Sequence, residues 1–426
     1  MLDIKFIREN PEVVKENIKK KFQDSKLKLV DELLEKDEKY RKLLQTSEKL
    51  RQQRNVLSEK INKLKKEGKS ASNELKEAKE IPQKLMKAEE EQEKFKQRIK
   101  EILLVIPNII HKSVPIGKNS KENVVRQVIG KPKKLNFTVK GHAELAEALG
   151  VADFDASART SGNGFYFLKG ELAQLNMALI NYARDYMIKK GYLYVEPPWM
   201  IRENVLKGVY SKEDIAQMSY KIEGEDLFLI ATSEHPLIGM FINQTISKKD
   251  LPIKLTGFSP CFRREIGSHG IDEKGLFRTH QFNKQEMVVI CEPEDSYKFY
   301  EEMQNHSKAI FKKLGLPIRE IECCSGDLSD LKAKSADLEA WSPRKNDYFE
   351  ITSVTNMEAA QARRLNIKVT DGKNTYFPHT LNNTVIATSR AMVAILENCQ
   401  NKDGTLTVPK VLVPYMNGIK VIGGKK

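Results

Sequence analysis

The stretch that decides the fold runs from Phe258 to Glu292 and reads FSPCFRREIGSHGIDEKGLFRTHQFNKQEMVVICE. Two segments with apolar flanks are separated by a charged turn that contains glycine, Asp272-Glu273-Lys274-Gly275. This pattern predicts two antiparallel strands joined by a long, mobile connection. Side chains two residues apart on a strand point to the same face, so we expect Arg263 and Glu265 to lie on one face.

The second segment carries polar and aromatic side chains at the same spacing. Phe282, Lys284 and Glu286 alternate along it and are expected to share one strand face. A folded core does not bury such charged groups unpaired. We interpret them as the walls of a site for a ligand with phosphate, a flat base and an amine. A solvent-exposed hairpin with ordinary charges is the alternative.

The order Phe-Arg-x-Glu, a loop, and then Arg-x-His-Gln-Phe-x-Lys-x-Glu is similar to motif 2 of the class II aminoacyl-tRNA synthetases. In detail it resembles the seryl-tRNA synthetase family, and the likeness covers essentially the whole chain. The resemblance implies an α+β fold, with an N-terminal antiparallel helical hairpin (a coiled coil) and a class II domain. In that domain, a mixed, mostly antiparallel β-sheet is flanked by helices.

The same resemblance implies an enzyme that activates L-serine with ATP to seryl-adenylate and pyrophosphate. Serine is then transferred to the 3′ end of tRNA(Ser), and the sequence leaves open whether tRNA(Sec) is charged as well. Two alternatives remain: a related ligase that charges a carrier protein, and a non-catalytic coiled-coil scaffold. The basic hairpin disfavours the first alternative, and the full set of candidate site residues disfavours the second.

Composition sets broader limits on function. The chain has 426 residues, of which 40% are hydrophobic and 31% charged, enough for two domains. A net charge of +14 favours a polyanionic partner, although a generally lysine-rich proteome would explain it too. No apolar run reaches the roughly 18 residues of a membrane span, and no signal peptide is evident, so we expect a cytoplasmic protein without membrane contact.

The five cysteines are odd in number and form no Cys-x-x-Cys pair. We therefore expect a reduced chain with no structural zinc. Cys323 and Cys324 could form a metal or redox pair, but adjacent residues of a strand face opposite ways.

Apolar residues at heptad spacing begin near Leu27 and continue to Leu64. Turn residues occupy 68–73, and a second apolar series runs from Ala78 to Ile102, which predicts two antiparallel helices. The tip is basic, and its candidate RNA-binding residues are Arg54, Lys60, Lys63, Lys65, Lys66 and Lys69. Such charges suit a nucleic-acid backbone, whereas a solvated coiled coil that joins protein partners is the alternative. The resemblance implies that this arm reaches the long variable arm of tRNA.

Three segments are expected: the helical arm at 1–106, a linker leading into the second domain at 107–135, and the class II catalytic domain at 136–426. A helix from Leu172 to Lys190 is followed by a short strand and a Pro-Pro pair. This unit resembles class II motif 1, which implies a homodimer through about 172–200. An ordinary helix–strand packing unit is the alternative.

Two further segments resemble substrate-binding elements of the family. The segment from Leu227 reads as a strand that ends in Thr232-Ser233-Glu234, although a helix N-cap before Pro236 fits equally well. The triplet is similar to the Thr-x-Glu element that holds serine. Glu350 and Ser353 offer hard oxygen ligands suited to Mg²⁺, with an ordinary edge-strand carboxylate as the alternative for Glu350.

The segment from His379 to Arg390 resembles motif 3. Asn383, Val385 and Ser389 stand where many seryl enzymes have glycine, a departure that resembles archaeal and eukaryotic members. The resemblance implies that Arg390 covers the adenine opposite Phe282 and reaches the γ-phosphate.

The resemblance thus implies a complete set of site residues, with ATP and Mg²⁺ as the expected cofactors. The catalytic residues would be Arg263, Glu350 and Arg390. ATP would be bound by Arg263, Arg264, Glu265, Thr279, Phe282, Glu350, Ile351, Thr352, Ser353 and Arg390. Serine would be bound by Thr232, Ser233, Glu234, Arg263, Glu286 and Thr384. Mg²⁺ would be held, together with ATP, by Glu350 and Ser353.

Overall fold

The computed structural model describes residues 1–265 and 275–424. The chain divides into two compact units, Leu2–Pro107 and Asn108–Lys426, the latter together with Met1. Most of the long connection predicted within 258–292 falls on residues 266–274, which lie outside the described residues.

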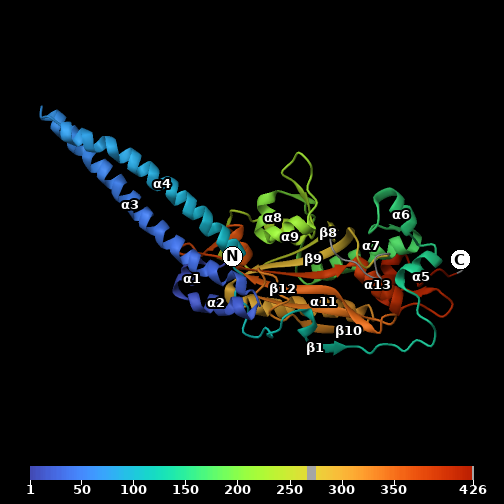
Figure 1. Ribbon diagram of the computed structural model, residues 1–426. Coiled ribbons are helices and arrows are strands. Elements are labelled where there is room, and N and C mark those ends of the chain that lie inside the picture. The colour runs from blue at the N-terminus through green and yellow to red at the C-terminus, as the bar shows by residue number, and fades with distance from the viewer. Residues whose placement is uncertain (266–274, 425–426) are drawn as a thin grey trace. The chain divides into compact units, whose positions relative to one another are not determined.

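The first unit is the predicted helical hairpin (Figure 1). Its elements are α1 (Ile4–Glu9), α2 (Pro11–Lys20), α3 (Leu27–Lys66) and α4 (Ser72–Val105). Apolar side chains of the two long helices meet along their shared face, with Leu57 and Ile61 buried on α3 and Ile81 and Leu85 buried on α4. The burial of a repeating apolar stripe from each helix against the other holds the hairpin together.

A polar contact lies within this apolar seam. Ser47 is fully buried, and Gln92 Nε2 donates to its hydroxyl and also to the Leu43 carbonyl oxygen at 3.0 Å. The polar pair is satisfied internally, so it specifies the register of the two helices without leaving an unpaired group in the seam.

The second unit is built on an eight-stranded sheet with the order β1-β10-β11-β12-β15-β9-β8-β4. Every neighbouring pair is antiparallel except the parallel pair of β4 and β8, which confirms the predicted mixed, mostly antiparallel sheet. In sheet order the strands are β1 (Val124–Ile129), β10 (Ile318–Glu322), β11 (Lys334–Ser342), β12 (Asp347–Glu358), β15 (His379–Ala387), β9 (Gln281–Cys291), β8 (Ile253–Phe262) and β4 (Leu193–Val195).

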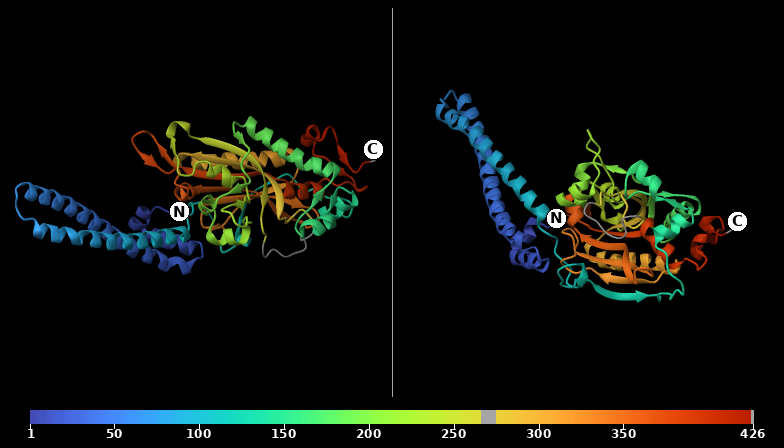
Figure 2. Two further views of the ribbon diagram at one scale, coloured as in Figure 1. Left: turned by 90° about the horizontal axis from the view of Figure 1, so that it is seen from above. Right: turned by 45° about the vertical axis from the view of Figure 1, so that its right-hand side comes forward.

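Three long helices pack on one face of this sheet: α7 (Gly170–Lys189), α11 (Ser296–Lys313) and α13 (Thr388–Asn398) (Figure 2). The main core lies between these helices and the sheet, and it includes Met287 and Val289 of β9. A smaller core includes the alternate β9 residues Val288 and Ile290. These positions pack with short helices, namely α8 (Glu203–Val209), α10 (Glu234–Gly239) and α12 (Ala360–Arg364).

This alternation places the site. Residues of β9 with even numbers share a face, and toward the start of the strand that face carries Phe282, Lys284 and Glu286 in place of aliphatic side chains. The long helices therefore cover one face of the sheet. On the other face, the short helices pack near the end of β9, and the part near the start of β9 is polar.

The remaining helices and strands are also short. The helices are α5 (His142–Ala148), α6 (Phe154–Ser161) and α9 (Lys212–Met218), and the short strands are β2 (Ala152–Asp153), β3 (Phe167–Leu168), β5 (Met200–Ile201), β6 (Phe228–Leu229), β7 (Thr245–Ser247), β13 (Lys368–Thr370), β14 (Thr375–Tyr376), β16 (Leu406–Thr407) and β17 (Val421–Ile422). Within the described residues, no helix has both the length and the apolar character needed to cross a membrane.

Candidate active site

The two predicted antiparallel strands are β8 and β9, which confirms that part of the prediction. The strand does not continue through Arg263 and Glu265, so the expectation that they share a strand face was wrong. β8 ends at Phe262, and Glu265 has a left-handed φ of 45°. After β8 the Arg263 N–H still donates to the His280 carbonyl oxygen at 2.9 Å, but the Arg264 N–H donates to the Met218 carbonyl oxygen at 3.1 Å, outside the sheet.

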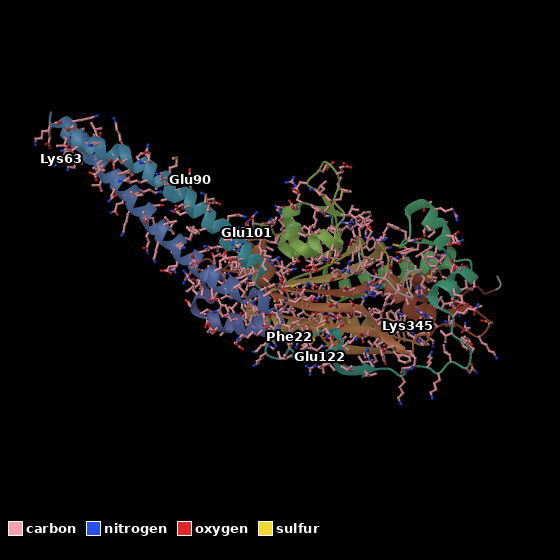
Figure 3. All side chains as sticks on the ribbon, in the orientation of Figure 1. Phe22, Lys63, Glu90, Glu101, Glu122 and Lys345 are labelled. Atoms are coloured by element: carbon pink, nitrogen blue, oxygen red, sulfur yellow. The ribbon has the colours of Figure 1, made fainter. Side chains whose placement is uncertain are left out.

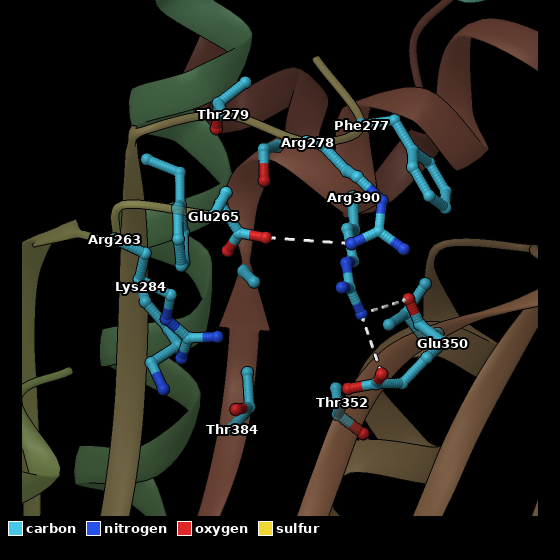
Figure 4. Close-up of a pocket in the computed structure, with 14 residues that line it drawn as sticks. Arg263, Glu265, Phe277, Arg278, Thr279, Lys284, Glu350, Thr352, Thr384 and Arg390 are labelled. Atoms are coloured by element: carbon cyan, nitrogen blue, oxygen red, sulfur yellow. Dashed lines mark hydrogen bonds and ion pairs between the residues drawn. The ribbon is translucent and has the colours of Figure 1, made fainter. Parts of the chain in front are cut away.

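Arg263 and Glu265 nevertheless line one cavity, which we call the arginine cavity (Figure 4). It is lined by Arg263, Glu265, Phe277, Arg278, Thr279, Phe282, Lys284, Glu350, Ile351, Thr352, Thr384, Ala387, Ser389 and Arg390. The cavity combines guanidinium groups, aromatic rings and carboxylates, which are the groups that bind phosphates and a flat base.

Two ion pairs shape this cavity, and both are drawn in Figure 4. Arg390 Nη1 lies 3.0 Å from Glu350 Oε2 and also donates to the Glu350 carbonyl oxygen. Arg278 Nη1 lies 3.7 Å from Glu265 Oε2. The arginine side chains are thereby oriented by carboxylates before any ligand is bound.

Aromatic rings lie against two of the arginines, Arg263 and Arg390. The Arg263 guanidinium is 5.3 Å from the centroid of the Phe282 ring, and that of Arg390 is 5.8 Å from the centroid of the Phe277 ring. Each arrangement is within the range of cation–π attraction. Thr279 and Thr352 contribute buried hydroxyls that have no hydrogen-bond partner among the described residues. Since buried polar atoms are normally paired, these hydroxyls are available to a ligand.

A second cavity adjoins the first, and we call it the glutamate cavity. The predicted residues that line it are Thr232, Glu234, Arg263, Glu286, Glu350, Ser353 and Thr384. Glu286 is buried, with Oε2 2.6 Å from Lys284 Nζ, and it accepts a hydrogen bond from Thr384 Oγ1 at 3.3 Å. Buried charges are tolerated when paired in this way.

Glu234 is the other buried carboxyl of this cavity. Its Oε1 accepts from Gln361 Nε2 at 2.8 Å and from Asn382 Nδ2 at 3.0 Å. Burial, together with the nearby negative charge of Glu286, raises the pKa of Glu234 to about 7. The segment before Glu234 agrees in part with each interpretation of the sequence, the strand and the helix N-cap. β6 is a strand of two residues, and α10 begins at Glu234 itself.

Glu350 and Ser353 come together through an irregularity in the sheet. Strict alternation would send side chains three residues apart to opposite faces. The register between β11 and β12 shifts, so that Leu338 pairs with Thr352 but Glu339 pairs with Glu350. This bulge inserts one residue, so Glu350 faces the same side as Ser353.

The strand β12 lies between β11 and β15, but its pairing with β15 runs only from Val354 to Glu358, so Glu350 itself is paired on one side, with Glu339. Partial desolvation in the cavity opposes ionisation of Glu350, whose side chain is 46% exposed, but the Arg390 guanidinium lowers the pKa of its carboxyl below the usual value. Asp337 pairs with Ser353 across the strands and adds a third oxygen group, with its pKa raised by burial and by the charge of Glu350. An all-oxygen set of this kind suits Mg²⁺. Among the described residues there is no group of three or more His, Cys, Asp and Glu side chains placed to hold a metal.

Two predicted residues point elsewhere. Arg264 is exposed and donates to the Ala216 carbonyl oxygen, and it lines neither cavity. Ser233 is fully buried and donates to the Gly257 carbonyl oxygen at 2.8 Å, so its hydroxyl supports the fold.

Several residues at the site were not predicted. Phe277 and Arg278 both line the arginine cavity. Arg278 is the first residue of Arg-x-His-Gln-Phe and Phe277 comes directly before it, so the motif itself was an available signal. Asp337, Gln361 and Asn382 were given no role, although Asn382 lies within the segment that resembles motif 3. Each reaches the site only through sheet pairing or a long-range hydrogen bond.

The basic tip of the hairpin is a separate surface. Lys60 is paired with Glu74 at 2.9 Å, and Lys69 with Glu67 at 2.8 Å. The other predicted basic residues of the tip are exposed and have no ion pair within the described part of the chain, namely Arg54, Lys63, Lys65 and Lys66. Figure 3 shows Lys63 at the end of the hairpin near the turn between α3 and α4. These unpaired charges are the part of the tip available to a polyanion.

Comparison with known proteins agrees with this architecture. Residues 218–399 match the family model described as the tRNA synthetase class II core domain (G, H, P, S and T), the class that the sheet and its site define. Residues 1–110 match the model described as the seryl-tRNA synthetase N-terminal domain.

Full-length relatives narrow the assignment. A serine–tRNA ligase of Methanocella arvoryzae is 47% identical over 99% of this chain and 100% of the relative. A crystal structure of seryl-tRNA synthetase from Pyrococcus horikoshii complexed with ATP is similar with a TM-score of 0.95 and 42% identity, covering 100% of both chains. The cytoplasmic serine–tRNA ligase of Naegleria fowleri, solved with AMP, has a TM-score of 0.89 and 34% identity, covering 100% of this chain and 99% of that one. This chain belongs to the seryl-tRNA synthetase family.

Proposed function

We propose that the chain activates L-serine with ATP and transfers it to the 3′ end of tRNA(Ser). The observation that carries the proposal is that the arginine and glutamate cavities adjoin. They share four lining residues, Arg263, Lys284, Glu350 and Thr384. One cavity suits a nucleotide and the other a small molecule with an amine and a hydroxyl. The relative from Pyrococcus horikoshii was solved with ATP, which supports the nucleotide assignment.

In the activation step, the serine carboxylate attacks the α-phosphorus of ATP, a P–O bond forms, and the bond to pyrophosphate breaks. No side chain needs to act as nucleophile, so catalysis consists of orienting the two substrates and stabilising negative charge. Arg263 lines both cavities and would hold the α-phosphate, where guanidinium geometry suits paired oxygens. Glu265 would accept from the adenine amino group, with Phe282 and Arg390 on the two faces of the base.

The serine side would be read by buried polar groups. Thr232, Glu234, Glu286 and Thr384 line the glutamate cavity and would bind the amine and the hydroxyl. A site whose polar groups pair with the substrate hydroxyl rejects alanine by about 10⁴-fold or more, because those groups would otherwise stay unpaired.

Mg²⁺ fits the oxygen groups at the strand bulge. Glu350 and Ser353 would hold it, with Asp337 beside them. When bound with ATP, the ion supplies charge neutralisation on the phosphate oxygens. The protein groups that act on the same phosphates are Arg263 and Arg390.

The proposal extends to partners and compartment. The exposed lysines of the hairpin tip would contact the backbone of tRNA(Ser). A homodimer would form through about 172–200, where Met177, Leu193 and Trp199 are 43%, 65% and 48% exposed and β4 ends the sheet. The protein would be cytoplasmic, since its five cysteines, all within the described residues, are free thiols.

The test is amino-acid-dependent ATP–pyrophosphate exchange, with serine compared with alanine, threonine, glycine and cysteine. Exchange with serine alone is the expected result, followed by charging of tRNA(Ser). Exchange with alanine or glycine would favour the carrier-protein ligase. No exchange with any amino acid, from folded protein, would reject the enzyme and leave the scaffold.

A further inference from the structure

One wall of the arginine cavity is the chain segment 275–279, which we call the nucleotide wall. Phe277, Arg278 and Thr279 line the cavity from this segment. Figure 4 shows Phe277 beside Arg390. The wall has no regular secondary structure, so something other than a strand ladder must hold its backbone in place.

The backbone of this wall is anchored by a buried histidine. The N–H of Leu276 donates to His142 Nε2 at 3.1 Å, and both residues are buried, with exposures of 0% and 2%. His142 is the first residue of α5, and it lines neither cavity. A neutral imidazole that accepts at Nε2 carries its proton on Nδ1.

The Nδ1 side of the ring faces a buried carboxylate. Glu397 Oε1 lies 3.5 Å from His142 Nδ1, and the Glu397 side chain is 1% exposed. This is a charge contact and not a hydrogen bond, because the buried Nδ1 has no hydrogen-bond partner among the described residues. The same oxygen accepts from Arg344 Nε at 3.1 Å, and Oε2 accepts from the Ser342 hydroxyl. Burial opposes ionisation, but the interactions with His142, Ser342 and Arg344 lower the pKa of Glu397 below its usual value, so the group is a carboxylate.

Gly275 shows how closely the wall rests on this histidine. A Cβ at Gly275 would lie 2.3 Å from His142 Nε2 and 3.1 Å from the Ala143 Cβ. Gly275 also has a backbone φ of +123°, which residues other than glycine rarely adopt. The backbone therefore passes directly over the imidazole, with no room for a side chain between them.

We propose that His142 is a positioning residue for nucleotide binding. The negative charge of Glu397 attracts the Nδ1 side of the ring, which leaves Nε2 to accept from Leu276, and this hydrogen bond fixes the nucleotide wall that presents Phe277 and Thr279 to the cavity. A similar arrangement, in which an outer carboxylate sets the orientation of a histidine that acts through its other nitrogen, recurs in protein sites. The inference rests on the proposed function, because it takes the ligand of the arginine cavity to be ATP.

The test is ATP–pyrophosphate exchange by the full chain, with KM measured separately for ATP and serine. His142→Ala removes the acceptor of the Leu276 N–H, and we expect KM for ATP to rise about tenfold while KM for serine changes less than about twofold. A role in stability alone would lower kcat through loss of folded enzyme and change neither KM. His142→Gln retains an acceptor near the Nε2 position and should recover most of the affinity for ATP.

His306→Ala is the matched control. Like His142, His306 is a histidine 3.5 Å from a carboxylate oxygen, here that of Glu302, with a side chain that is 12% exposed, but it lines neither cavity. An unchanged KM for ATP in His142→Ala, or an equal rise in His306→Ala, would overturn the proposal. If His142→Ala does not fold, Gly275→Ala decides the same question. It displaces the wall from the ring, so a raised KM for ATP supports the proposal and an unchanged one refutes it.

Failure of this inference and failure of the proposed function are distinguishable. No serine-dependent exchange by the unmodified chain would reject the function. Isothermal titration calorimetry of ATP with the unmodified and His142→Ala proteins would still measure whether the histidine increases the affinity for the nucleotide. Equal affinities would refute the inference.

Discussion

At the scale of single residues, the two arginines Arg263 and Arg264 show how local geometry separates neighbours of the same type. Arg263 lines both cavities, while the Arg264 guanidinium contacts the Ala216 carbonyl oxygen outside them. We expect Arg263→Ala to lower serine-dependent exchange at least about 100-fold, because a preorganised charge beside the reacting phosphate is lost. Arg264→Ala is the matched comparison, with an expected loss of at most about threefold. Equal losses in the two variants would contradict the role given to Arg263.

The raised pKa of Glu234 predicts that kcat/KM for serine depends on pH. Its pKa is raised to about 7, so the free enzyme holds the group neutral at lower pH and as a carboxylate at higher pH. The ammonium group of serine is bound better by the carboxylate. We therefore expect kcat/KM for serine to rise as pH increases through about 7, by roughly tenfold between pH 6 and pH 8.

The side-chain amide of the Glu234→Gln variant does not titrate. We therefore expect this variant to be less active and to show no rise in kcat/KM for serine as pH increases through about 7. KM for ATP, measured across the same pH range, serves as the internal control. A flat serine profile for the unmodified enzyme would refute this role of Glu234.

At the scale of elements, the hairpin tip offers a test of RNA binding. Lys63, Lys65 and Lys66 are exposed without ion pairs among the described residues. Replacing all three by alanine should raise KM for tRNA(Ser) roughly tenfold and reduce the salt dependence of binding by about two to three units of slope. Serine-dependent exchange should not change, because no tRNA takes part in it.

The control for this variant is Lys60→Ala combined with Lys69→Ala. Both lysines are already paired with carboxylates, so their removal should have the smaller effect. If the triple variant charges tRNA normally, the tip is a solvated coiled-coil surface and the alternative interpretation holds.

At the scale of the whole molecule, the proposed homodimer depends on the edge of the sheet. Leu193 is 65% exposed on β4, the last strand in the sheet order. Leu193→Glu would bury a charge from each copy in the interface, so we expect the dimer dissociation constant to rise at least about tenfold. Sedimentation equilibrium measures this change directly.

Val421→Glu alters an apolar residue of β17 that is 42% exposed and lies outside 172–200, and its mass in solution should match that of the unmodified chain. A monomeric unmodified protein at micromolar concentration would reject the proposed dimer, and an unaffected Leu193→Glu dimer would place the interface elsewhere.

The sequence by itself determined the hairpin and the strands β8 and β9, because heptad spacing and alternating patterns are local properties of the chain. It also indicated most side chains that line the arginine cavity, through motifs held within short segments, but fewer than half of those that line the glutamate cavity. Only the tertiary structure decided that the bulge in β12 turns Glu350 to the side of Ser353, since a bulge depends on the partner strand.

The contacts that complete the site are also tertiary. Gln361 and Asn382 reach Glu234 from 127 and 148 residues away, and His142 reaches Leu276 across 134 residues. No local pattern encodes such contacts, because they exist only once the sheet has brought distant segments together. The sequence therefore indicated the charged and aromatic groups of the motifs, and the packing of the sheet decided which of them meet and which further residues join them.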